Sequence, residues 1–178
     1  MKRIVGIAVL FLMAMTGCKN EKTEDGAAAP KEQALNHFRV ILDVVAKKDD
    51  TFSLFYTTDG STDFSKIPVI WKDLKGNDNT QQVTFDLPDG ATPTQLRLDF
   101  GVKKEQEPVA FKKITIQYHE KTFSAEGANV FKYFRTTDDS TVDVATGTLT
   151  AKVINGEKKS ISLYPSDPLA TELNTLAL

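Results

Sequence analysis

The sequence predicts an all-β domain: a two-sheet antiparallel sandwich, jelly-roll-like, with a short C-terminal helix. Apolar and polar residues alternate in several segments, turn-forming residues separate those segments, and only the end of the chain adopts a helical period. Alternation with period two places apolar side chains on one face of each strand, as in antiparallel sheets with one face in water. A parallel α/β fold would need helical segments between the strands, and the sequence offers none there.

Five segments carry the alternation. Their apolar positions fall within residues 38–44, 52–56, 83–87, 96–100 and 114–118. Gly, Asn, Asp and Pro residues, which favour turns, mark residues 59–60, 76–79, 88–90, 126–127 and 155–156. Short strands at this spacing favour a sandwich or jelly roll.

The last predicted hairpin surrounds Asn155-Gly156, a dipeptide typical of a two-residue type I′ turn. That turn would place Leu149 opposite Ser162 and mix apolar with polar side chains on each face. A three-residue loop over 154–156 places Leu149 opposite Ile161 instead. Because a slip of one residue inverts the faces of a strand, the apolar pattern predicts the three-residue loop.

The C-terminus changes to a helical period. Asp167 can cap a helix, and Pro168 suits its first position. Leu169, Leu173 and Leu176 then recur at helical spacing. We expect this short helix to pack its leucines on the sandwich; a helix that binds a partner is the alternative.

The N-terminus predicts a signal peptide over residues 1–17. Lys2 and Arg3 precede an apolar stretch at 4–15. This stretch of about a dozen residues is too short to span the roughly 30 Å of hydrocarbon in a bilayer. A secretion signal is therefore favoured over a transmembrane anchor.

The residues Met15-Thr16-Gly17-Cys18 resemble the lipobox of bacterial lipoproteins, with Met15 where that family usually has Leu. The resemblance implies cleavage after Gly17 and acylation of Cys18 by fatty acids such as palmitate. Lys19 follows in place of the Asp that marks inner-membrane retention in enteric bacteria, so the resemblance implies the outer membrane. Cys18 is the only cysteine, which excludes an intramolecular disulfide.

The rest of the chain divides into two parts. Residues 18–35 comprise the predicted lipidated cysteine and a segment of polar and small residues, which we expect to be a flexible tether. Residues 36–178 have the length of one domain, the predicted β-sandwich.

Several functional classes have no support in the sequence. The Gly-x-Ser-x-Gly, His-Glu-x-x-His, P-loop and Gly-x-Gly-x-x-Gly motifs are missing, and we predict that the protein is not an enzyme. The 22 basic and 24 acidic residues are interspersed, whereas nucleic-acid binding needs a clustered basic face. Acidic turn residues could hold Ca²⁺, but a role in the turns themselves is favoured.

Four residues are candidates for ligand binding. Trp71, the only tryptophan, could stack on a sugar ring, although its apolar run at 67–71 favours a core position. Tyr133 lies in a run of aromatic and basic residues that defines no face. Arg97 and Asp99 share the polar face of one strand, where they form either a surface ion pair or the floor of a polar binding site.

A second resemblance concerns the domain. The segments 50–56, 82–88, 96–101 and 114–116 look like the β-sandwich ectodomains attached to some bacterial membrane glycosyltransferases and to related envelope lipoproteins. The resemblance implies an accessory module in glycan or envelope metabolism, with catalysis elsewhere, and it assigns no functional residue.

These observations lead to three functional hypotheses. The first is a lipid-anchored envelope lipoprotein, facing the periplasm or the outside, whose non-catalytic sandwich binds a glycan or another envelope component. The second is a structural or assembly subunit that docks to an envelope protein. The third and least supported is a glycan hydrolase, which needs two convergent carboxylates.

Replacing Cys18 with Ser tests the anchor. Acyl chains contribute about 0.8 kcal/mol per buried CH₂ group, so a multiply acylated cysteine anchors a protein stably. We expect the variant to leave the membrane fraction and to lose the acyl mass from its N-terminal peptide in mass spectrometry. A variant that stays in the membrane fraction would contradict lipidation.

Overall fold

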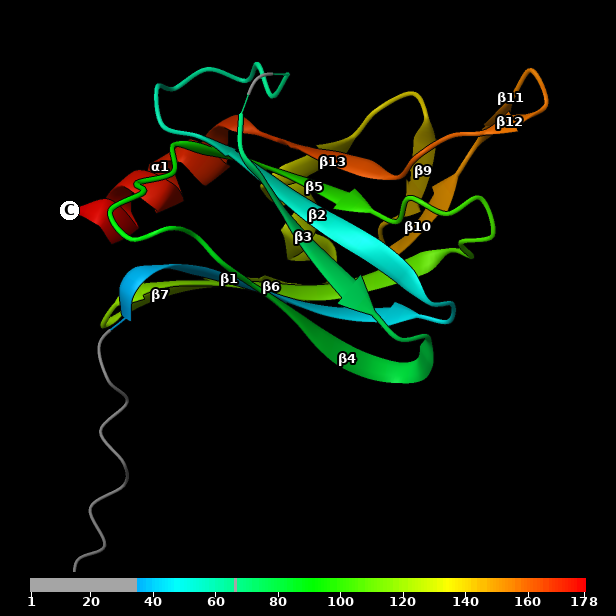
Figure 1. The fold of residues 1–178 in the computed structure, drawn as a ribbon, viewed down its shortest axis with the longest axis horizontal. Coiled ribbons are helices and arrows are strands. Elements are labelled where there is room, and N and C mark those ends of the chain that lie inside the picture. The colour runs from blue at the N-terminus through cyan, green and yellow to red at the C-terminus, as the bar shows by residue number, and fades with distance from the viewer. Residues whose placement is uncertain (1–34, 66) are drawn as a thin grey trace, which may run out of the picture. The chain divides into compact units, whose positions relative to one another are not determined.

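The computed structural model describes residues 35–65 and 67–178, and it confirms the predicted all-β sandwich with a short C-terminal helix (Figure 1). Two antiparallel sheets form its layers. Cys18, the signal peptide and nearly all of the predicted tether lie outside the described residues. No helix among the described residues is long and apolar enough to cross a membrane.

Sheet A contains six strands. In spatial order they are β4 (Asn77–Asp86), β1 (Leu35–Ala46), β6 (Val109–His119), β10 (Thr148–Ala151) and β9 (Ser140–Asp143), with β7 (Lys121–Glu126) also paired to β6. The first strand of the domain, β1, is therefore an interior strand with antiparallel partners on both sides.

Sheet B contains five strands. In spatial order they are β3 (Val69–Leu74), β2 (Asp50–Thr57), β5 (Gln95–Phe100), β13 (Ser162–Pro165) and β8 (Phe134–Thr136). A 3₁₀ helix, η1 (Gly127–Lys132), connects β7 to β8. The chain crosses between the sheets repeatedly, so residues from both halves of the sequence meet in each sheet.

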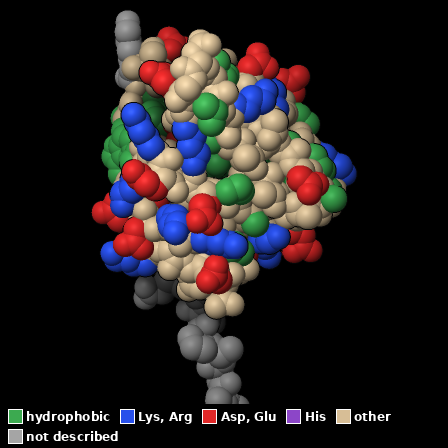
Figure 2. Space-filling model, turned by 90° about the vertical axis from the view of Figure 1, so that its right-hand side faces the viewer, with side chains coloured by type: hydrophobic (Ala, Val, Ile, Leu, Met, Phe, Trp, Pro, Cys, Tyr) green, Lys and Arg blue, Asp and Glu red, His purple; other side chains and the backbone are tan. Residues whose placement is uncertain are grey.

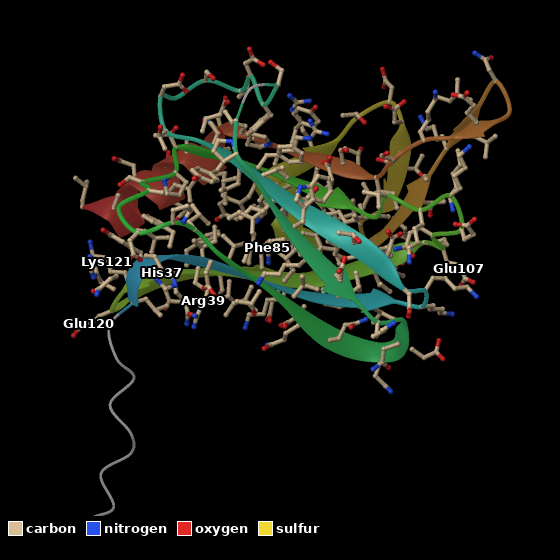
Figure 3. The ribbon with its side chains drawn as sticks, in the orientation of Figure 1. His37, Arg39, Phe85, Glu107, Glu120 and Lys121 are labelled. Carbon is tan, nitrogen blue, oxygen red and sulfur yellow. The ribbon has the colours of Figure 1, made fainter. Side chains whose placement is uncertain are left out.

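The core lies between the two sheets and is rich in aromatic side chains. Phe100 contacts Phe52 edge-on at 5.2 Å between ring centroids, and Phe111 of the opposite sheet at 5.3 Å. Phe85 is fully buried as well, and Figure 3 shows it between the layers. These rings fill the roughly 10 Å between stacked sheets.

The helix α1 (Asp167–Ala177) confirms the helical period of the C-terminus. Its three leucines at 169, 173 and 176 are buried against the sandwich, as the pattern predicts. The cap differs from the prediction: Ser166 holds the N-cap position and Asp167 is the first helical residue. Asp167 thus provides the negative charge that a first helical turn favours.

The prediction of a three-residue loop in the last hairpin is wrong. Val153 pairs with Lys158 and Ile154 with Glu157, so Asn155 and Gly156 form a two-residue turn, both with positive φ. The reason is that the flanking chain segments separate after this short ribbon of β11 (Val153–Ile154) and β12 (Glu157–Lys158). Leu149 continues in sheet A and Ile161 leads into sheet B, so each is buried without facing the other.

Leu163→Ala tests the core. Leu163 is fully buried on β13, an interior strand of sheet B, and we expect the variant to lower the free energy of unfolding by about 2–5 kcal/mol. The matched control is Val153→Ala on the exposed ribbon, which should change the free energy of unfolding by less than about 0.5 kcal/mol. Urea unfolding of both variants measures the difference, and equal stabilities would contradict the assignment of the core.

Candidate functional site

The outer face of sheet B carries a row of aromatic and basic side chains that crosses the strands. Phe55 on β2 lies opposite Arg97 on β5, and Tyr164 on β13 lies opposite Arg135 on β8. Trp71 on β3 lies diagonally beside Phe55, since it pairs with Ser53. We call Trp71, Phe55, Arg97 and Tyr164 the aromatic row.

The side chains of the aromatic row contact one another in sequence. The guanidinium carbon of Arg97 lies 4.7 Å from the ring centroid of Phe55 and 4.9 Å from that of Tyr164. Phe55 meets Trp71 edge-on at 6.5 Å. A cation over an aromatic face contributes about 0.5–2 kcal/mol, so two such rings hold the Arg97 head group in place.

Asp99 fixes the same guanidinium from a second direction. Nε and one terminal nitrogen of Arg97 donate to the two carboxylate oxygens of Asp99, at 2.9 and 2.6 Å. Their side chains are only 22% and 15% exposed. The structure therefore shows the ion pair, which is bidentate and partly shielded from solvent, the geometry that makes Arg–carboxylate contacts specific.

The predicted core position of Trp71 is wrong. Its side chain is 50% exposed on the outer face of sheet B. Ile70 and Leu74, on the alternate positions of β3, turn toward the core instead. Trp71 alternates with these two residues on β3, so it lies on the outer face of sheet B although the run around it is apolar.

Ser53 and Asp99 form the next row of the same face. Ser53 pairs with Trp71 on one side and with Asp99 on the other. The serine is 2% exposed, and its Oγ has no hydrogen-bond partner among the described residues. Of the two residues that flank this buried serine, Trp71 is half-exposed and Asp99 is largely shielded from solvent.

Tyr133 does not join this face. It follows η1, is half-buried, and packs edge-on against Phe123 of β7 at 4.8 Å. There it lines a separate polar hollow of about 430 Å³ with Asn129 and Lys132. The structure thus brings three of the four candidate residues onto one face and places the fourth elsewhere.

Sequence reasoning missed Phe55 and Tyr164. Phe55 could have been recognised from the sequence, because it is a large apolar residue at a polar position of an alternating strand, between the buried Leu54 and Tyr56. The sequence has no pattern that would identify Tyr164, because β13 has only four residues and three of them are buried.

The acidic turn residues mostly stabilise their own turns. Asp59 accepts the backbone N–H of Ser61, and Asp63 accepts that of Ser65. Bonds from Ser61 and Ser65 lower the pKa of Asp59 and of Asp63, respectively. Within 35–65 and 67–178, no three His, Cys, Asp or Glu side chains gather as a metal would require.

The outer face of sheet A carries a different cluster. Asp86 accepts from Arg39 Nε at 2.6 Å and lies 3.1 Å from His37 Nε2. The hydrogen bond from Arg39 is the main reason why the pKa of Asp86 is lowered. His37 and Arg39 both belong to β1 (Figure 3). Within the described residues, no aromatic ring packs on the Arg39 guanidinium as Phe55 and Tyr164 pack on that of Arg97.

Comparisons with known proteins identify no relative: no family model, curated protein or solved structure matches the chain.

Phe55→Ala tests the packing of the aromatic row. The change removes the ring that separates Trp71 from Arg97, and we expect it to lower the free energy of unfolding by about 1–3 kcal/mol. Since Trp71 is the only tryptophan, its fluorescence reports on this face alone. Acrylamide quenching should increase in Phe55→Ala and stay unchanged in Tyr133→Ala; equal quenching in both variants would contradict the contact.

Proposed function

We propose that the protein is a non-catalytic envelope lipoprotein whose aromatic row binds a glycan. The observation that carries the proposal is the half-exposed Trp71 beside Phe55 and the Arg97–Asp99 pair. An indole ring offers an apolar face on which the C–H groups of a sugar ring can pack.

Polar groups beside such a ring provide the directional contacts that a sugar needs. Two carboxylate oxygens have about four lone-pair sites, and Arg97 occupies one site on each oxygen of Asp99. The remaining sites can accept sugar hydroxyl groups. Because the rings and Asp99 already fix Arg97, binding orders few side chains, which limits the entropic cost of association.

The lipid anchor remains a prediction from the sequence around Cys18. Residues 19–34, which separate that cysteine from β1, span at most about 55 Å when fully extended. A domain on such a tether could reach glycans near the membrane surface to which the acyl chains bind, in the outer membrane of the proposed setting.

Docking to an envelope protein is the competing function, because exposed tryptophan is also typical of protein interfaces. The distribution of exposed apolar side chains favours the glycan. Trp71, Val102, Val144 and Val153 are the exposed large apolar side chains of the described β-domain outside α1 and its end, and they lie on separate strands and loops. A protein interface is usually a contiguous patch.

A glycan array probed with the detergent-solubilised full-length chain tests the proposal. We expect binding to at least one envelope-type glycan, with a change in Trp71 fluorescence. Trp71→Ala should weaken it about tenfold or more, a loss of roughly 1.4 kcal/mol or greater.

The matched control is Tyr133→Ala, which removes an aromatic ring outside the aromatic row and should bind as the wild type does. Absence of glycan binding, together with co-purification of an envelope protein that Trp71→Ala abolishes, would replace the glycan with a protein partner.

A further inference from the structure

A small cavity with a basic rim lies at one end of the sandwich, away from the aromatic row. The loop at 101–108, between β5 and β6, meets the connection at 159–161 that leads into β13. The cavity measures about 40 Å³ and has Phe100 and Ile161 in its wall. Figure 2 looks onto this end of the molecule, where lysine side chains gather with acidic side chains between them.

Gln106 presents an unused hydrogen-bond donor at the cavity. The residue lines the cavity and is only 4% exposed. Its Oε1 accepts the backbone N–H of Glu107 at 3.1 Å, which leaves the amide nitrogen for other contacts. Nε2 has no hydrogen-bond partner among the described residues. A buried donor without a partner costs about 1–3 kcal/mol, so an acceptor placed here is stabilising.

The charged side chains that line the cavity are all lysines, at positions 103, 104, 158 and 159. Lys158 donates to the carbonyl oxygen of Gln106, and Lys103 donates to that of Asp49 at 2.9 Å. Carbonyl partners hold these two ammonium groups without neutralising them. Within the described part of the chain, Lys159 is the one of these four lysines that forms an ion pair, with Glu157 at 3.4 Å.

A buried acid, Asp50, lies beside this loop; it is 2% exposed, and its Oδ2 has no hydrogen-bond partner among the described residues. Its Oδ1 accepts the backbone N–H groups of Thr51, Val102 and Lys103, at 2.7, 2.9 and 3.2 Å. These bonds fix the loop that carries Gln106. Gly101 has a φ of +96°, and a Cβ atom there would lie 2.5 Å from Asp50 Oδ2, so only glycine permits this approach.

We propose that this cavity binds an oxyanion, the carboxylate or phosphate group of an envelope molecule. The Gln106 amide donates to it from the wall, while Lys104 and Lys158 supply positive charge at the rim. The small volume admits only the anionic group, so the rest of the ligand stays outside. This site uses none of the residues of the aromatic row and does not depend on the glycan proposal.

Titration of the full-length chain with sodium phosphate and with sodium acetate tests the proposal, with chloride keeping the ionic strength constant. We expect saturable binding of at least one anion in calorimetry and a rise in melting temperature. The tighter of the two anions identifies the group as phosphate or carboxylate.

Two variants and a control separate a site from general charge effects. Gln106→Glu keeps the shape and the acceptor but replaces the amide donor with a negative charge, and should weaken binding at least tenfold. Lys104→Gln changes an exposed side chain without risk to the fold and should weaken binding several-fold. Lys132→Gln makes the same charge change at η1 and should have no effect.

Three results would overturn the proposal. One is the absence of saturable binding of both anions, which fits a water molecule between Gln106 Nε2 and Asp50 Oδ2. Another is wild-type binding by both Gln106→Glu and Lys104→Gln. The last is an equal loss in Lys104→Gln and Lys132→Gln, which would show screening by overall charge.

Discussion

Each sheet of the sandwich buries one face against the other, and this constraint decides which side chains reach solvent. Leu54, Leu98 and Leu163 must point inward to fill the core, so the residues that alternate with them must point outward. The aromatic row results from that alternation. Phe55, Arg97 and Tyr164 come from distant parts of the chain, yet the antiparallel register aligns them across three neighbouring strands.

The long strands could be predicted because they carry enough residues to show a period. β1, β2, β4, β5 and β6 include the five alternating segments except for Leu87, which follows β4, and α1 buries the three leucines that marked it. Short strands such as β8 and β13 carry too few residues to define a face. Their pairing depends on where the rest of the chain places them.

The two errors about side-chain placement share a physical cause, which is tertiary position. Trp71 lies in an apolar run, but the run forms an edge strand with one face in water. Leu149 and Ile161 are both apolar, but Leu149 lies in sheet A whereas Ile161 precedes β13 of sheet B, so the two need not face each other. The local sequence around Trp71, Leu149 or Ile161 would look the same whichever way its side chain pointed. Its direction depends on which strands the segment pairs with.

The two proposed binding regions differ in how firmly their cations are held. Arg97 is a planar group fixed by two rings and a carboxylate, which suits recognition of a ligand in one orientation. At the loop end the cations are lysine ammonium groups around the amide of Gln106, and Lys103 and Lys158 donate to backbone carbonyl oxygens there. Such a rim attracts an anion by charge and leaves the orientation to the buried donor.

The interior position of β1 has a mechanical consequence. β1 begins at Leu35, the first residue of the domain that the structure describes. This strand is bonded along both edges, to β4 and to β6, and both neighbours run antiparallel to it. A pull directed along the strand would load many backbone hydrogen bonds in shear at once, whereas a peripheral strand would peel away one bond at a time. Pairing along both edges therefore makes β1 resistant to a force that acts along its length.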